Sequence, residues 1–138
     1  MLVLDSCAAI AILKKTPEGN AFTGLMEVSE ITIAPELYKA EIISALRKHV
    51  STGEYTLELA HSMLEEAIGL VDEYVDMQEN CIEALDESIR QNHSIYDMLY
   101  LTLARRNGAT LFTLDKRLIA LCEKLKIDCI HMMSMLES

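Results

Sequence analysis

The stretch Ser94–Leu118, SIYDMLYLTLARRNGATLFTLDKRL, decides the fold that we expect of this chain. It predicts an almost wholly apolar helix over Ser94–Arg106, a glycine stop, a short strand over Ala109–Thr113 and the start of another helix. Two carboxylates stand at unusual places: Asp97 in the first turn of the apolar helix, and Asp115 where the strand gives way to a helix. Ligands of open α/β sheets bind at the carboxyl ends of the strands, so both acids are candidate site residues.

Short apolar runs elsewhere in the chain predict four more strands. These strands are expected at Leu2–Leu4, Glu30–Ile33, Tyr74–Val75 and Ile127–Ile130. Asp5 follows the first of them and so occupies the same kind of strand end as Asp115. Ser6 comes next and is expected to cap the helix of CAAIAIL.

Helical patterns alternate with these strands. They lie after Thr16-Pro17, over Pro35–His49, over Leu57–Val71, around Cys81, Ile82, Leu85 and Ile89 (which share one face), and over Lys116–Leu125. Strands that alternate with helices are typical of an α/β domain with a mainly parallel sheet. The length of 138 residues favours one domain, over 1–138.

Composition narrows the class of protein. Apolar residues make up 51% of the chain, which excludes a disordered protein. No apolar run is long enough to span a bilayer, and the first residues carry no basic region, so we expect a cytoplasmic protein without a signal peptide. The four cysteines form no CxxC and are interpreted as reduced core or near-core residues. The four histidines are scattered and are interpreted as surface or turn residues; they are His49, His61, His93 and His131.

The net charge of −10 argues against nonspecific binding of nucleic acid. An acidic chain repels phosphate backbones at long range and favours a basic partner or a cationic ligand. Basic residues that are candidates for a strip beside a site are Lys14, Lys15, Lys39, Arg47, Lys48, Arg105, Arg106, Lys116 and Arg117.

Four acids, Asp5, Glu41, Asp97 and Asp115, are unusual as a set. Taken singly, each has an ordinary structural explanation: Ser94 with Asp97 is a capping-box pattern, and Asp115 is able to cap a helix. As a cluster, however, carboxylates about 4 Å apart repel by roughly 4 kcal/mol per pair at an effective dielectric of 20, so they need cations. An all-oxygen site suits Mg²⁺ or Mn²⁺, which activates water for phosphodiester hydrolysis.

Four motifs in order carry a family resemblance. VLDS with Asp5, PELYKAEIISAL with Glu41, SIYDMLYLTLA with Asp97 and TLFTLDKRL with Asp115 resemble those of PIN-domain proteins, of the kind found as VapC-type toxins. The resemblance covers essentially the whole chain. Met98 departs from the family pattern, where a small residue is usual, and leaves the neighbouring acid untouched.

The resemblance implies a three-layer α/β/α fold with a parallel sheet of about five strands. It implies that the four acids converge on one or two Mg²⁺ ions, with Ser6 and Thr113 as supporting hydroxyls. The implied activity is metal-dependent endoribonuclease cleavage of RNA. In that reading three of the acids bind metal and orient the attacking water, and Asp115 completes the site or helps to hold a second ion.

The resemblance also implies partners. We expect a basic antitoxin whose tail lies beside the acids, with the helical stretch Pro35–Val71 as its docking surface, and a homodimer through another face. Two alternatives within the family are an RNA-processing enzyme without an antitoxin and a non-catalytic module that binds metal and a partner. A third is a phosphatase with Asp5 as nucleophile, which in haloacid-dehalogenase-like enzymes needs a second Asp two residues on; Cys7 stands there.

Overall fold

The computed structural model describes residues 1–28 and 31–130. Five strands form one parallel sheet in the order β3-β2-β1-β4-β5. They are β1 (Leu2–Leu4), β2 (Thr32–Pro35), β3 (Glu73–Val75), β4 (Thr110–Phe112) and β5 (Cys129–Ile130). All five expected strands are therefore present. Glu30 and His131 lie outside the described residues.

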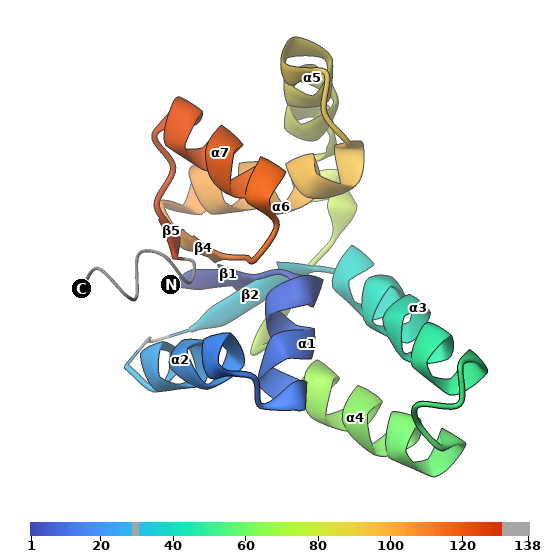
Figure 1. Ribbon diagram of the computed structural model, residues 1–138. Coiled ribbons are helices and arrows are strands. Elements are labelled where there is room, and N and C mark those ends of the chain that lie inside the picture. The colour runs from blue at the N-terminus through green and yellow to red at the C-terminus, as the bar shows by residue number, and fades with distance from the viewer. Residues whose placement is uncertain (29–30, 131–138) are drawn as a thin grey trace.

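The helices cover both faces of this sheet, with α1 to α4 on one side and α5 to α7 on the other (Figure 1). Their bounds are α1 (Ser6–Lys14), α2 (Pro17–Met26), α3 (Leu37–Ser51), α4 (Leu57–Gly69), α5 (Cys81–Gln91), α6 (Ile95–Asn107) and α7 (Lys116–Leu125), and a 3₁₀ turn, η1 (Met77–Glu79), precedes α5. The expected three-layer α/β/α fold is confirmed. No helix within 1–28 and 31–130 combines the length and apolarity needed to cross a bilayer.

The strand order places a topological switch between β1 and β4. From β1 the chain moves outward to β2 and β3, then returns to the other side of β1 for β4 and β5. Leu4 pairs with Phe112, and the N–H of Asp5 donates to the Phe112 carbonyl at 3.2 Å. The residues that follow β1 and β4 therefore leave the sheet side by side, at the kind of crevice where α/β proteins bind ligands.

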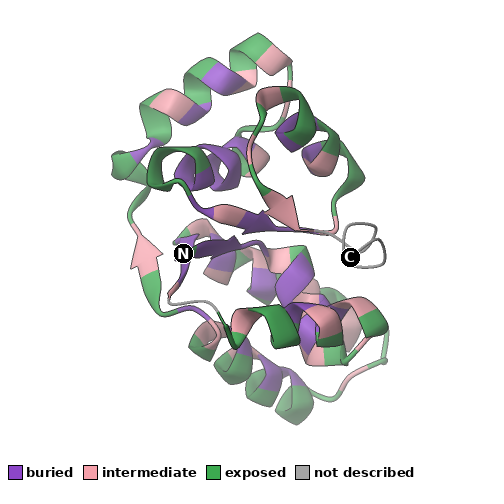
Figure 2. Cartoon of the chain, turned by 90° about the vertical axis from the view of Figure 1, so that its left-hand side faces the viewer, coloured by how far each residue is buried: buried purple, intermediate pink, exposed green. Residues whose placement is uncertain are grey.

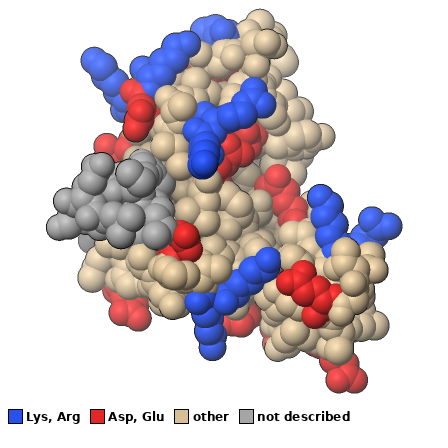
Figure 3. Space-filling model, viewed as in Figure 1, with Lys and Arg blue, Asp and Glu red and all other residues tan. Residues whose placement is uncertain are grey.

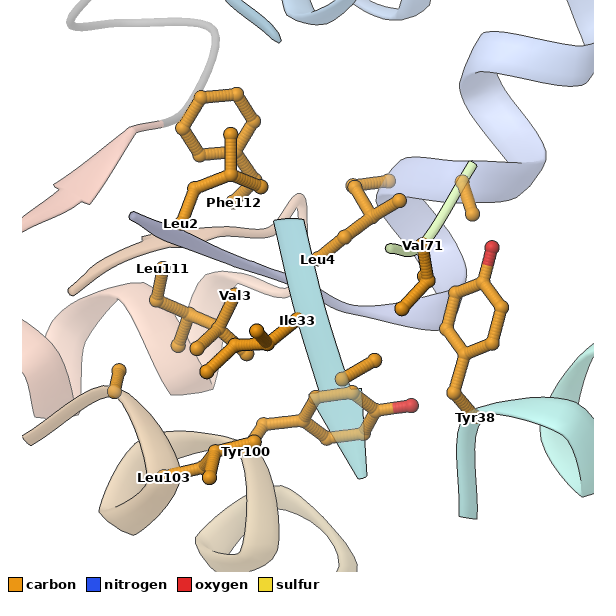
Figure 4. Close-up of a cluster of buried hydrophobic side chains, with 14 of the residues drawn as sticks. Leu2, Val3, Leu4, Ile33, Tyr38, Val71, Tyr100, Leu103, Leu111 and Phe112 are labelled. Carbon is orange, nitrogen blue, oxygen red and sulfur yellow. The ribbon is translucent and has the colours of Figure 1, made fainter. Parts of the chain in front are cut away.

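The hydrophobic core lies on both faces of the central strands. Figure 4 shows Val3, Ile33, Leu111 and Tyr100 gathered around β1 and β2. In α6, every residue from Met98 to Ala104 is buried, which confirms the apolar helix predicted from the sequence. Purple, buried stretches line the sheet and the inner sides of the helices in Figure 2.

Two local predictions are wrong. Pro35 does not open a helix but ends β2: it pairs with Val75, and the next residue, Glu36, supplies the N–H that bonds the Val75 carbonyl at 3.1 Å. A proline without a backbone donor is tolerated at such a position. Ser6 does not cap α1, because Asp5 does so, accepting the N–H of Ala8 at 2.9 Å.

The cysteines are only partly as expected. All four are free thiols, and Cys122 is buried, but Cys7 and Cys81 are exposed. Cys81 begins α5, whose apolar residues also face solvent: the exposed fractions are 74% for Ile82, 54% for Leu85 and 71% for Ile89. The stripe seen in the sequence exists, but the opposite face of α5 packs on the core.

Candidate active site

Asp5 is the most enclosed of the four predicted acids, with 5% of its surface exposed. It follows the central strand β1, and its side chain caps α1. Burial raises its pKa from 3.8 to about 6, against the opposing effect of hydrogen bonds from the Thr113 hydroxyl and the Ala8 N–H. The negative charge of Glu41 raises this pKa further. Asp5 is therefore a carboxylate that gains from a nearby cation.

Thr113 and Cys7 complete the surroundings of Asp5. Thr113 is fully buried after β4, and its hydroxyl also accepts the backbone N–H of Asp115 at 3.1 Å. The Cys7 thiol donates to both carboxylate oxygens of Asp5, at 3.1 and 3.3 Å. Although the residue is exposed, burial of the sulfur, followed by the Asp5 charge, raises the pKa of Cys7 to about 12. The thiol keeps its proton, so the candidate metal ligands around Asp5 are oxygen atoms.

Glu41 projects from α3 and is held by two hydroxyls. Ser6 on α1 donates to its Oε1 at 3.2 Å, and Tyr100 on α6 donates to the same atom at 2.6 Å. Ser6 therefore follows Asp5 in the chain and contacts Glu41 through its side chain. Ser6 contacts Glu41 and Thr113 contacts Asp5, and their role as supporting hydroxyls of a metal site stays a prediction.

Asp97 and Asp115 are engaged locally. The Asp97 Oδ2 lies 2.7 Å from Nε2 of His93, which precedes it by four residues. Asp115 is exposed, and its Oδ1 accepts the N–H groups of Arg117 at 2.9 Å and Leu118 at 3.1 Å, so it caps α7 as the sequence predicts. Ser94 caps α6 through the Tyr96 N–H.

The metal site remains a prediction. Within the described parts of the chain, no three His, Cys, Asp or Glu side chains stand close enough together to hold an ion. The structure links Asp5 and Glu41 through Ser6, and connects Asp115 to Asp5 through Thr113. Asp97 lies on the same helix as Tyr100. The carboxylate and hydroxyl chemistry of this set fits Mg²⁺ or Mn²⁺, and both ions prefer oxygen ligands.

The family model described as "PIN domain" matches residues 2–124. The chain belongs to the PIN-domain family. The phosphatase alternative needs a second Asp two residues after Asp5, and Cys7 stands there. Membership of the PIN-domain family leaves that alternative without support.

Relatives of this PIN-domain chain include two proteins named Ribonuclease VapC1, from Mycobacterium tuberculosis strains CDC 1551 / Oshkosh and ATCC 25618 / H37Rv. Each is 34% identical over 119 residues, which cover 86% of this chain and 88% of the relative.

Solved structures share the fold. PAE2754 from Pyrobaculum aerophilum aligns with a TM-score of 0.69 and 20% identity, over 86% of this chain and 77% of that one. VapBC2 from Rickettsia felis, solved with a DNA fragment from its promoter, aligns with a TM-score of 0.67 and 18% identity, over 94% and 96% of the two chains.

Two grooves flank α3 of this PIN domain. A polar cleft of about 330 Å³ begins at Glu41 and is lined by Ser6, Glu41, Ser44, Ala45, Lys48 and His49. An apolar groove of about 370 Å³ lies between α3 and α4, lined by Ile43, Leu46, Arg47, Val50, Ser51, Leu57, Ala60, His61 and Leu64. Figure 3 shows acidic side chains in the hollow between α7 and α3, with basic side chains on either rim.

Sequence reasoning missed three residues around the acids: Tyr100, His93 and Cys7. Tyr100 lies one helical turn after Asp97, within the stretch SIYDMLYLTLA that carries the family resemblance, and the sequence offers these two signals for it. The sequence predicts a surface or turn position for His93, and the residue lies in the connection between α5 and α6, but no sequence pattern indicates its contact with Asp97. The Cys7 thiol lies within the site although the sequence suggested only core packing.

Proposed function

We propose that this PIN-domain protein is a metal-dependent endoribonuclease that hydrolyses RNA phosphodiester bonds, and the toxin of a toxin–antitoxin pair. The observation that carries the proposal is the coupling of buried Asp5 to Glu41 through Ser6 at the switch point of the sheet. It is supported by 34% identity to a protein named a ribonuclease.

The acids have distinct roles in this proposal. Asp5, Glu41 and Asp97 would hold Mg²⁺ or Mn²⁺ and orient the attacking water, and Asp115 would complete the site. A cation bound there would supply positive charge that polarises a phosphate oxygen and lowers the pKa of water. Thr113 and Ser6 hold the carboxylates of Asp5 and Glu41 in place.

RNA binding has to overcome the net charge of −10. The polar cleft along α3 offers a route, because Ser44, Lys48 and His49 follow Glu41 on one helical face. Hydroxyls and a single ammonium suit the phosphates of one RNA strand beside the bond that is cut. A modest number of basic contacts fits an enzyme that binds RNA weakly.

Cleavage of single-stranded RNA with and without metal tests the proposal. The parent should cut RNA in Mg²⁺ and not in EDTA, and its products should carry 5′-phosphate and 3′-hydroxyl ends, because water rather than the ribose 2′-OH attacks phosphorus. Asp97→Asn should abolish both cleavage and the rise in melting temperature that Mg²⁺ gives the parent. Glu65→Gln, on the exposed side of α4, is the matched control.

Contrary results separate the alternatives. A 2′,3′-cyclic phosphate product, or cleavage in EDTA, would refute the mechanism. Mg²⁺ binding without cleavage would favour the non-catalytic module. Cleavage by a protein that neither arrests growth nor has a basic partner encoded beside it would favour the RNA-processing enzyme.

We infer two protein-binding surfaces for the toxin role. The apolar groove between α3 and α4 lies within the expected docking stretch and suits an amphipathic segment of a basic antitoxin. The exposed apolar face of α5, made by Ile82, Leu85 and Ile89, is on the other side of the sheet and suits a second copy of this chain.

A further inference from the structure

The hydroxyl of Tyr100 is directed at Glu41 rather than at backbone. Tyr100 is 2% exposed on α6, and its OH donates to Glu41 Oε1 at 2.6 Å, 59 residues away in the chain. A tyrosine hydroxyl carries its proton at neutral pH, so it is the donor in this bond.

Two other tyrosines show how this chain satisfies a hydroxyl for structural purposes. Tyr38 donates to the carbonyl of Ala67 at 2.7 Å, and Tyr74 donates to the carbonyl of Ile68 at 2.7 Å. Both acceptors are backbone groups of α4. Tyr100 differs in that its acceptor is a carboxylate of the proposed site.

The position of Tyr100 on α6 couples two of the acids. Asp97 precedes it by three residues, so both side chains lie on one side of the helix, with their Cα atoms about 4.5 Å apart along its axis. The Tyr100 hydroxyl donates to Glu41 on α3, so it ties the helix that carries Asp97 to the side chain of Glu41.

Ser6 acts on the same oxygen from α1, at 3.2 Å. Because Oε1 accepts two hydrogen bonds, the carboxylate of Glu41 is restrained in rotation. We propose that Tyr100 is a positioning residue: together with Ser6 it restrains Glu41 so that the second carboxylate oxygen, Oε2, is presented to the metal ion. This inference rests on the proposed function and adds a residue outside the four acids to the metal-binding machinery.

The test compares Tyr100→Phe with Tyr38→Phe. Each variant removes one buried hydroxyl and keeps its ring, so the two should lose similar metal-free stability in urea unfolding. Only Tyr100→Phe should weaken Mg²⁺ binding, by about 10- to 100-fold as for other groups that orient metal ligands. Calorimetric titration of the full chain with Mg²⁺ measures this, and saturating metal should restore much of kcat while KM for RNA stays unchanged.

The outcomes are distinguishable. If the parent binds no Mg²⁺ and cuts no RNA, the proposed function fails and this inference fails with it. If the parent binds Mg²⁺ and Tyr100→Phe binds it equally well, the proposed function stands and the inference is overturned. Ser6→Ala covers the case in which Tyr100→Phe does not fold: it removes the other donor to Oε1, and unchanged Mg²⁺ affinity would contradict the restraint of Glu41.

Discussion

His93 Nε2 lies 2.7 Å from Oδ2 of Asp97, across the first turn of α6. The histidine is itself fixed, because its backbone N–H donates to the Ser88 carbonyl at 3.1 Å and its carbonyl accepts the Ser88 hydroxyl at 2.5 Å. Asn92, with φ 48°, forms the left-handed turn that brings His93 round from the end of α5. The carboxylate of Asp97 therefore depends on the α5–α6 turn for its orientation.

Replacing His93 should weaken metal binding. We expect His93→Ala to lower Mg²⁺ affinity about tenfold, because Asp97 loses the donor that orients it. His93→Gln keeps a side-chain donor and should retain most of the affinity. Calorimetric titration with Mg²⁺ measures both variants. Tighter binding by His93→Ala would show instead that the histidine competes with the ion for Asp97.

The raised pKa of Asp5 predicts that the free energy of unfolding of the metal-free protein falls as the pH rises. Burial raises that pKa from 3.8 to about 6, so the folded chain holds the proton more tightly than the unfolded chain. The contribution of Asp5 to the free energy of unfolding is therefore fully present below about pH 4. It is lost as the pH rises through about 6, and the free energy of unfolding falls by roughly 3 kcal/mol. Asp5→Asn has no such carboxylate and still caps α1.

Urea unfolding in EDTA tests whether the stability of the metal-free protein falls as the pH rises. At pH 7.5 Asp5→Asn should be more stable than the parent, and at pH 4 the two should unfold at similar denaturant concentrations. Asp72→Asn provides a control acid outside the site, because the Asp72 carboxylate accepts the Thr32 N–H at the sheet edge. A difference between parent and Asp5→Asn that does not change with pH would disprove the linkage.

Lys48 is expected to contact an RNA phosphate. Each phosphate contact on a single strand contributes about 0.7 to the slope of log affinity against log salt. Lys48→Gln should therefore raise KM for RNA and reduce the salt slope of kcat/KM by about that amount. Lys124→Gln, at the far end of α7 where the amine contacts Gln91 at 2.9 Å, should change neither. Equal effects of the two variants would exclude the α3 cleft as the RNA route.

The exposed face of α5 is expected to hold a homodimer together. Ile89→Glu places a charge in an apolar interface, so the variant should elute as a monomer in size exclusion with light scattering, with unchanged circular dichroism. Ile43→Glu, in the apolar groove by α3, should remain dimeric. A monomeric parent, or a dimeric Ile89→Glu, would rule out this interface.

The sequence predicts the sheet well because its strands are short apolar runs that end in recognisable polar residues. Asp5 after Leu4 and Asp115 after the β4 segment both mark strand ends in the structure. A contact such as Tyr100 to Glu41 is beyond sequence reasoning, because it depends on how α3 and α6 are placed by the sheet between them.

The orientation of α5 also cannot be predicted from the sequence. The sequence places its apolar residues on one face but does not show which face meets the core. In the structure Ala84 and Glu87 are the buried residues of α5. Arg105 of α6 forms a hydrogen-bonded ion pair with Glu87, and this contact, opposed by burial, lowers the pKa of Glu87. A buried charge is tolerated only with such a partner, and the pairing becomes visible only once the two helices are packed.

We expect Mg²⁺ and the proposed antitoxin to compete for the acids. Glu41 lies two residues before the groove residue Ile43 on α3. A basic tail that leaves the groove at that end of α3 would therefore be expected near Glu41, where a cation would relieve the same repulsion as Mg²⁺. Mg²⁺ affinity and RNA cleavage should therefore both fall when the partner is bound. Glu41→Gln should weaken the complex more than Glu65→Gln does, because only the former removes a charge at the site. Ile43→Glu should disrupt the complex through the groove and leave the Mg²⁺ affinity of the free protein unchanged. Equal Mg²⁺ affinity with and without the partner would mean that the antitoxin inhibits by covering the RNA cleft rather than by occupying the acids.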